Sequence, residues 1–191
     1  MSPEPIVDFE WRVRKVSARS LGPSWRRGCP VPVSDLRSVS VRFWGFDHAP
    51  HTGVLILNRD VVKRTRRVFA TMFERKFPLR QVRPVSEFKA DDDLSMAADN
   101  TSAFNCRKAV AAGPASWSRH AYGRAIDVNP VENPYLFGKR VLPPAGRKFA
   151  DRSHARRGLI RRADPIHRAF LDAGYRWGGD FSNPDYQHFD R

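Results

Sequence analysis

Four side chains in two short segments have the types and spacing of a catalytic metal site. His120 and Asp127 lie seven residues apart with Gly123 between them, and Asp185 precedes His188 by three residues. Two imidazoles and one carboxylate leave a zinc ion one open position for water, as in catalytic rather than structural zinc sites. Asp185 can then act as general base in a metal-assisted hydrolysis. The sequence therefore predicts Zn²⁺ held by His120, Asp127 and His188, with Asp185 as a catalytic residue.

Each segment also has an ordinary structural interpretation. The first could be a surface loop followed by a salt-bridged aspartate, and the second could carry an exposed histidine. Tyr186 and Phe189 beside His188 favour burial of this histidine. Residues three apart on a turn lie on the same side, which would bring Asp185 near the water on the metal. The remaining histidines lack a carboxylate at ligand spacing and are predicted not to bind metal: His48, His51, His154 and His167.

Arg107 is the candidate for an electrophilic partner in the reaction. It ends a predicted strand thirteen residues before His120. A planar guanidinium can pair with a substrate carboxylate or stabilise the negative charge of a tetrahedral intermediate. The alternative is an ordinary surface arginine, because the chain has 34 lysines and arginines. A serine hydrolase is not supported, because the chain lacks a Gly-x-Ser-x-Gly turn.

The element that must orient Asp127 is a predicted strand over residues 124–129, ended by Pro130. Side chains alternate along a strand, so Asp127 faces the side opposite to Ile126 and Val128. Gly123 lets the chain turn tightly between His120 and this strand. Further strands are predicted at 54–57, buried on both faces, and at 81–88 and 102–107, the last two separated by a polar linker at 91–100.

Two helices are predicted from apolar residues at helical spacing. The first is capped by Asp60 and runs to about Lys76, with a basic face that is either solvated surface or a contact for a polyanion. The second is capped by Asp164, has Pro165 in its first turn and stops at Gly174. Residues 138–163 form a long basic loop, which is either disordered or one wall of a substrate groove.

These elements predict an α+β fold: a single domain with a small, mainly antiparallel sheet flanked by helices and the zinc site on the sheet. Residues 1–38 contain five prolines and little periodicity, so we expect an N-terminal arm or irregular wrap, with a mobile terminus as the alternative. Residues 39–191 form the expected catalytic domain.

The net charge indicates which classes of partner the chain attracts. A formal net charge of +14 over 191 residues predicts attraction to polyanions, among them nucleic acid, anionic lipid and the phosphate-rich polymers of bacterial walls. No segment approaches the roughly 18 apolar residues of a membrane span. The first residues lack the features of a secretory signal, so a signal has been removed or the chain leaves the cell by another route, as a phage lysin does. Cys29 and Cys106 are either disulfide-bonded, which suits an extracytoplasmic setting, or two reduced buried thiols.

The motifs also resemble a known family. Ser118-x-His120-x-x-Gly123-x-Ala125-x-Asp127, with an acidic residue three before His188, is similar to the VanY-type zinc peptidases, the D-alanyl-D-alanine carboxypeptidases and L-alanyl-D-glutamate endopeptidases of peptidoglycan. The likeness covers roughly residues 25 to 191. Other segments carry it as well: Trp44–Asp47, His51–Gly53, Asn100–Arg107, Val128–Pro130, Asn133–Tyr135 and Trp177–Phe181.

The resemblance implies a hedgehog-like peptidase fold and a role for each site residue. His188 is the third zinc ligand, Asp185 is the catalytic base, Arg107 contacts substrate or the developing negative charge, and Ser118 holds substrate or the ligand loop. The segment ending in Arg107 departs from the more widespread Tyr-Arg or Phe-Arg form of the family.

The first choice of activity is a zinc-dependent D-alanyl-D-alanine carboxypeptidase acting on the stem peptides of peptidoglycan. The alternative within the family is an L-alanyl-D-glutamate endopeptidase that serves as a cell-wall lysin, an endolysin. Anionic wall polymers are a further expected partner, and the site of action is extracytoplasmic, secreted or wall-associated. A non-catalytic basic module that binds polyanions is the rival from another class; no nucleic acid is expected, because the sequence has no nucleic-acid-binding fold signature.

Overall fold

The computed structural model describes residues 8–110 and 116–191. Its largest sheet joins β1 (Trp11–Lys15), β2 (Leu36–Trp44) and β3 (Pro50–Asn58) in antiparallel order. Along β2 the buried side chains alternate with partly exposed ones from Val39 to Trp44, as expected for a strand with one face on the core. The strand predicted at 54–57 lies within β3, where Leu55, Ile56 and Leu57 are all buried.

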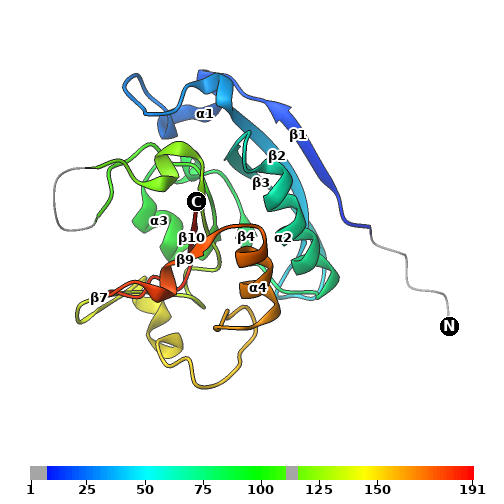
Figure 1. Ribbon diagram of the computed structural model, residues 1–191, viewed down its shortest axis with the longest axis vertical. Coiled ribbons are helices and arrows are strands. Elements are labelled where there is room, and N and C mark those ends of the chain that lie inside the picture. The colour runs from blue at the N-terminus through cyan, green and yellow to red at the C-terminus, as the bar shows by residue number, and fades with distance from the viewer. Residues whose placement is uncertain (1–7, 111–115) are drawn as a thin grey trace.

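Helix α2 (Val62–Glu74) packs against β2 and against α4 (Pro165–Asp172), as Figure 1 shows. Its apolar side, with Val68, Phe69 and Met72, is buried in the main core. The predicted second helix is confirmed as α4, with Pro165 in its first turn and Gly174 just beyond its end. Asp60 does not cap α2: the cap residue is Val61, and the Asp60 carboxylate pairs with the Arg124 guanidinium at 2.6 Å.

A second antiparallel sheet carries two of the candidate ligands. Its strands are β6 (Ala125–Asp127), β10 (His188–Asp190) and β9 (Arg176–Trp177), and β10 is the middle strand. The strand predicted at 124–129 is therefore present in its central residues. Phe189 of β10 is buried and its ring stacks on Phe170 of α4, with centroids 3.7 Å apart. This stacking joins the sheet to the core that α2 and α4 share.

The remaining elements are short. Two-stranded pairs are formed by β4 (Gln81–Val82) with β5 (Asn100–Thr101), in parallel, and by β7 (Tyr135–Phe137) with β8 (Arg140–Leu142). The other α-helices are α1 (Ala18–Leu21) and α3 (Asp92–Ala97). Single 3₁₀ turns make up the rest: η1 (Gly22–Ser24), η2 (Val33–Asp35), η3 (Val85–Phe88), η4 (Arg119–Tyr122), η5 (Pro144–Phe149) and η6 (Gly178–Asp180).

Three predicted elements are wrong in type. The strand expected at 81–88 ends after Val82, because Pro84 has no backbone N–H to continue a ladder and leads into η3. The strand expected at 102–107 makes one bridge, Ser102 to Asp127, and then sends its amides to separate partners instead of one strand. The polar linker expected at 91–100 contains α3, capped by Asp91, whose carboxylate accepts from the Leu94 amide at 3.0 Å.

The fold is α+β, with separate antiparallel sheets where one small sheet was predicted. The 138–163 segment, predicted as a long loop, contains β8 and η5. Within the described residues no helix is long and apolar enough to cross a membrane. The division into an arm at 1–38 and a catalytic domain at 39–191 stays a prediction, and residues 1–7 of that arm lie outside the described part.

Cys29 and Cys106 form a disulfide. The bond lies beside a small second core that contains Leu21, Val31 and Phe104. It joins the segment before β2 to the segment that leads to Arg107. Of the two alternatives left open by the sequence, the structure has the bonded pair.

Candidate metal centre

The candidate ligands come from three neighbouring elements. Asp127 ends β6, His188 begins β10, and the two residues are direct partners in the antiparallel register. Directly opposite residues have Cβ atoms about 5 Å apart on the same face of a sheet. His120 lies in η4, which precedes β6 by a single turn. The pairing of the last strand with β6 therefore brings together side chains that are 61 residues apart in the sequence.

The ligand atoms of this cluster converge. His120 Nε2 lies 3.1 Å from Asp127 Oδ2 and 3.1 Å from His188 Nδ1, and His188 Nδ1 lies 3.0 Å from Asp127 Oδ1. Tetrahedral zinc with ligand distances of about 2.0–2.2 Å separates its ligand atoms by about 3.3–3.6 Å, a few tenths of an ångström more than the separations here. Two imidazoles and one carboxylate at these separations fit a zinc ion with one position left open. Among the described residues, His120, Asp127 and His188 form the group of histidine, cysteine or acidic side chains that is arranged closely enough to hold a metal ion.

His120 is held in one tautomer and one direction. Its Nδ1 hydrogen-bonds to the Ala103 carbonyl, so this nitrogen carries the proton and Nε2 presents its lone pair to the cluster. The turn around it is fixed from β3: Asn58 donates from its backbone N to the Gly123 carbonyl at 2.9 Å and from Nδ2 to the Tyr122 carbonyl at 3.0 Å. Gly123 has φ +66°, a left-handed conformation that favours glycine.

Ser118 acts on the same turn through the backbone. It caps η4, and its Oγ accepts from the His120 amide at 3.2 Å. The side chain also lines the cleft in front of the ligands. The structure therefore gives Ser118 a contact to the ligand loop, while contact with substrate stays a prediction.

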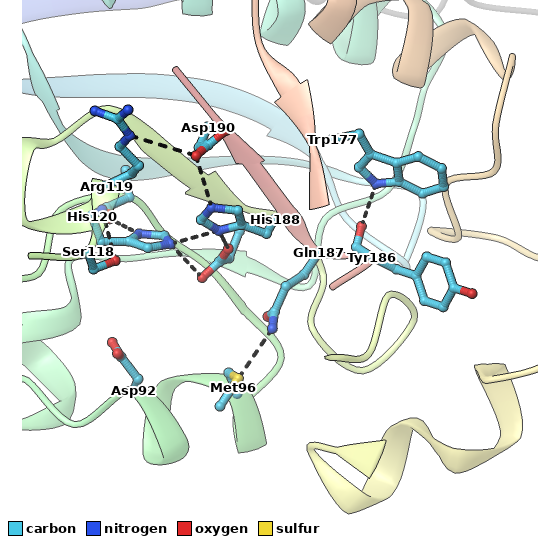
Figure 2. Close-up of polar contacts among 12 residues, drawn as sticks. Asp92, Met96, Ser118, Arg119, His120, Trp177, Tyr186, Gln187, His188 and Asp190 are labelled. Atoms are coloured by element: carbon cyan, nitrogen blue, oxygen red, sulfur yellow. Dashed lines mark hydrogen bonds and ion pairs between the residues drawn. The ribbon is translucent and has the colours of Figure 1, made fainter. Parts of the chain in front are cut away.

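His188 has a second acidic neighbour on its outer side. Asp190 Oδ2 lies 4.0 Å from His188 Nε2, and Arg176 binds both oxygens of Asp190, at 3.0 and 2.8 Å (Figure 2 draws Asp190 beside His188 and Arg119). At this distance the Asp190 carboxylate makes no hydrogen bond to His188, but its charge favours the protonated imidazole and helps to raise its pKa. The Asp190 side chain is only 5% exposed, so this charge is not dispersed in water.

Charges within the cluster shift the protonation of its members. Burial alone would raise the pKa of Asp127, but the charges and hydrogen bonds of His120 and His188 outweigh it and lower the pKa. Burial alone would lower the pKa of His188, but the hydrogen bond and charge of Asp127 outweigh it and raise the pKa. Because imidazole must lose its proton to bind a metal, metal binding at this cluster releases protons.

Asp185 lies in the same cleft but outside the converging ligand atoms. Its amide donates to the Gly178 carbonyl at 2.9 Å, and it bridges to Tyr135 of β7. Its Oδ1 is buried, with no hydrogen-bond partner among the described residues. Burial raises the pKa of Asp185 to about 6, with the Asp127 charge adding to the shift. A carboxyl group with a pKa this close to neutrality can both take up and release a proton at working pH.

Arg107 lines the same cleft and is already partnered. Its Nε pairs with the Asp92 carboxylate on α3. Burial lowers the pKa of Arg107, and the charges of Asp127 and Asp185 oppose that shift, because they lie near the guanidinium. The residue ends an irregular segment, where a strand was predicted. Its Nη1 donates to the Lys108 carbonyl at 3.2 Å, and the residue lines the cleft together with Asp127 and His188.

The cleft has a volume of about 240 Å³ and includes residues that the motifs did not single out. Phe181 lines it with 42% of its surface exposed, and its ring centroid lies 6.1 Å from that of His188. Gln187 lines it while buried: its Nε2 donates to Met96 Sδ at 3.4 Å, as Figure 2 shows, and Oε1 has no partner among the described residues. Only its place inside Asp185-x-Gln187-His188 could have singled out Gln187 from sequence.

The other histidines lie elsewhere. His51 pairs with the exposed Asp47 at 2.9 Å, and its ring stacks on the buried Phe43. His167 is buried edge-on against Trp177. Neither these two nor His48 and His154 belongs to a metal-binding group in the part of the chain that the structure describes. That these four histidines bind no metal stays a prediction.

Comparison with known proteins supports the same chemistry. Residues 112–191 match the family model described as D-alanyl-D-alanine carboxypeptidase. No curated protein and no solved structure matches the chain. The match covers less than half of the chain, and the matched segment contains the candidate ligands His120, Asp127 and His188 together with Asp185. Over residues 112–191 the chain is therefore similar to the D-alanyl-D-alanine carboxypeptidases, and this match supports the VanY-type zinc peptidase family.

Proposed function

We propose that the chain is a zinc-dependent D-alanyl-D-alanine carboxypeptidase that removes the terminal D-alanine from peptidoglycan stem peptides. The observation that supports it most is the convergence of His120, Asp127 and His188 beside the Asp185 carboxylate in one cleft. We further propose a hedgehog-like peptidase fold for residues 39–191, with residues 1–38 as an arm, and an extracytoplasmic, secreted or wall-associated site of action. The disulfide supports that location, because such bonds persist in oxidising compartments.

A zinc ion held by these ligands would lower the pKa of a water toward about 7 and polarise the scissile carbonyl. The Asp185 carboxylate takes the proton from the attacking water and delivers it to the leaving amine. Its raised pKa suits both transfers, because the same group must be a base first and an acid afterwards. Ser118 holds the turn that carries His120. Gln187 offers Oε1 as an acceptor for an amide N–H of the peptide.

Arg107 would bind the terminal carboxylate of the substrate or the negative charge that develops on the carbonyl oxygen. Its ion pair with Asp92 favours the alternative activity, because a compensated guanidinium attracts a free carboxylate less strongly. An L-alanyl-D-glutamate endopeptidase, whose substrate chain continues past the scissile bond, does not require that attraction. The Asp92–Arg107 pair is thus the feature on which the choice between the two activities depends.

Mass spectrometry of a stem pentapeptide and of purified peptidoglycan, incubated with zinc-loaded protein, tests the proposal. Loss of one terminal alanine supports the carboxypeptidase, whereas a new D-glutamate amino terminus establishes the endopeptidase. Asp185→Asn is the control, because it should bind zinc and leave both substrates uncut. Unchanged substrates with bound zinc in the parent protein would overturn the peptidase assignment and favour a non-catalytic polyanion-binding module.

A second pair of variants separates the two activities further. If Arg107 reads a terminal carboxylate, Asp92→Asn should lower KM for the free-acid pentapeptide, and this gain should vanish for the C-terminal amide. Arg107→Gln should raise KM for the acid and change KM for the amide little. Equal effects on both peptides would show that Arg107 does not recognise the terminal carboxylate.

A further inference from the structure

Positive charge without a carboxylate partner gathers on the side of the fold away from the cleft. Arg67, Thr71 and Arg75 follow one another at four-residue spacing on α2 and its C-terminal cap, so they share a face of the helix. Arg168 comes from α4, which packs against α2. These residues line a groove of about 340 Å³.

A second groove adjoins the first and shares Arg75 and Pro165 with it. It has a volume of about 330 Å³ and is further lined by Lys76, Arg156 and Arg157. We call the two together the basic groove. None of its lining residues lines the cleft of the metal centre. In Figure 1, α2 and α4 lie to the right of β9 and β10, while α3 and β7 of the cleft lie to the left.

The arginines of the basic groove have no acidic partner among the described residues. Within residues 8–110 and 116–191, the guanidiniums of Arg67, Arg75 and Arg168 form no ion pair and no hydrogen bond. Elsewhere arginines are neutralised locally, as by Glu10, Glu87 and Asp180. Arg156 and Arg157 donate to the carbonyls of Lys148 and Phe46, at 3.0 and 3.2 Å, and have no further hydrogen-bond partner in the described part of the chain.

Acidic groups do not cancel this charge. One carboxylate of the first groove, Asp172, stands against three guanidiniums. Asp164, which lines the second groove, is engaged by Arg161 at 3.6 Å and accepts from the Arg161 amide at 3.0 Å. A concave surface with several uncompensated guanidiniums binds phosphates, since each contact releases a counterion from the polymer.

We propose that the basic groove binds a flexible polyol-phosphate polymer of the bacterial wall and holds the enzyme beside its substrate. The choice of a wall polymer as the partner rests on the proposed function, whereas the inference that the groove binds phosphate groups does not. Nucleic acid is disfavoured because single strands are held by aromatic stacking as well as charge. Phe77 is the one aromatic residue among the described residues that line the basic groove, and it packs against the core.

Fluorescence anisotropy with labelled poly(glycerol phosphate), over a series of salt concentrations, tests the proposal. The groove variant is Arg67→Gln/Arg75→Gln/Arg168→Gln. Its matched control, Arg14→Gln/Arg19→Gln/Arg27→Gln, removes the same charge from exposed arginines near the N-terminal strand. We expect binding by the groove variant to weaken at least about tenfold and its salt slope to fall by about 2, with a much smaller change in the control.

Equal weakening in the two variants would overturn the proposal, because net charge alone would then explain binding. Tighter binding of a single-stranded oligonucleotide of equal charge than of poly(glycerol phosphate) would also overturn it. Hydrolysis of soluble pentapeptide should be unchanged in both variants, which shows that they are folded. If the parent protein cuts no peptide but keeps groove-dependent polymer binding, the proposed function fails and the groove stands.

Discussion

At the scale of single residues, a few contacts fix the side-chain orientation of each candidate ligand. The Ala103 carbonyl holds His120, the strand register holds Asp127 against His188, and Asp190 stands behind His188. Ligands that are oriented before a metal arrives lose little conformational freedom on binding it, which favours affinity.

Zinc stoichiometry checks this arrangement. The parent protein should bind about one zinc ion, His120→Ala should lose it, and His51→Ala should keep it, because His51 pairs with Asp47 far from the cluster. Binding should weaken as pH falls, since the raised pKa of His188 makes protons compete with the metal. Isothermal titration calorimetry in buffers of different ionisation enthalpy measures both the stoichiometry and the protons released. Retention of zinc by His120→Ala would contradict the ligand set.

Asp185 should leave a pH signature in stability as well as in activity. Its pKa is raised by burial to about 6, against 3.8 in the unfolded chain, so the folded protein holds this proton more tightly. The resulting stabilisation is complete below about pH 4 and is lost as pH rises through about 6. In chelated protein, Asp185→Asn should therefore gain on the parent by on the order of 1–2 kcal/mol between pH 4 and 7.

Urea unfolding of both proteins at several pH values measures this difference. A constant difference across the range would show that Asp185 titrates normally. With zinc bound the gain should shrink, because a neighbouring cation favours the carboxylate.

At the scale of elements, the turn from η4 into β6 packs closely against the backbone of β3. A Cβ on Gly123 would lie 2.7 Å from the Asn58 backbone N, and φ there is +66°. Gly138 provides a matched control, with φ +59° and nothing within 4 Å of an added Cβ.

Gly138→Ala should therefore lower the free energy of unfolding by about 1 kcal/mol, because alanine must adopt the left-handed backbone there. Gly123→Ala should cost at least about 3 kcal/mol, because the backbone of β3 must also move. It should weaken zinc binding too, since the turn carries His120. Thermal unfolding and zinc titration of the two variants check this, and equal losses would show that the β3 contact does not matter.

What the sequence could predict follows from how local each feature is. His120, Asp127, Asp185 and His188 were found because they sit in two short motifs, and α4 because Asp164, Pro165 and Gly174 bracket it. Helix α3, which supplies Asp92 and Met96 to the cleft, was missed because Ser95 is its buried residue and no apolar period marks it. The prediction of a strand at 102–107 fails because the backbone amides there bond to separate, distant partners, which the local sequence does not reveal.

At the scale of the whole molecule, the disulfide links two segments that lie far apart in the sequence. Cys29 and Cys106 close a loop of 77 residues that contains β2, β3 and α2. Cross-linking a loop of this size removes unfolded-chain entropy, so Cys29→Ser/Cys106→Ser should lower the free energy of unfolding by about 2–5 kcal/mol. Urea unfolding of the variant, beside the parent with and without reductant, measures this. Agreement of the variant with the unreduced parent would show that the bond adds no stability.

The middle position of β10 has a consequence for how the second sheet assembles. This strand pairs with both β6 and β9, and it follows both of them in the sequence. Without residues 188–190, β6 and β9 have no strand between them, and the candidate cluster lacks His188. Deletion of these residues should therefore separate the two edge strands and abolish zinc binding in a single step.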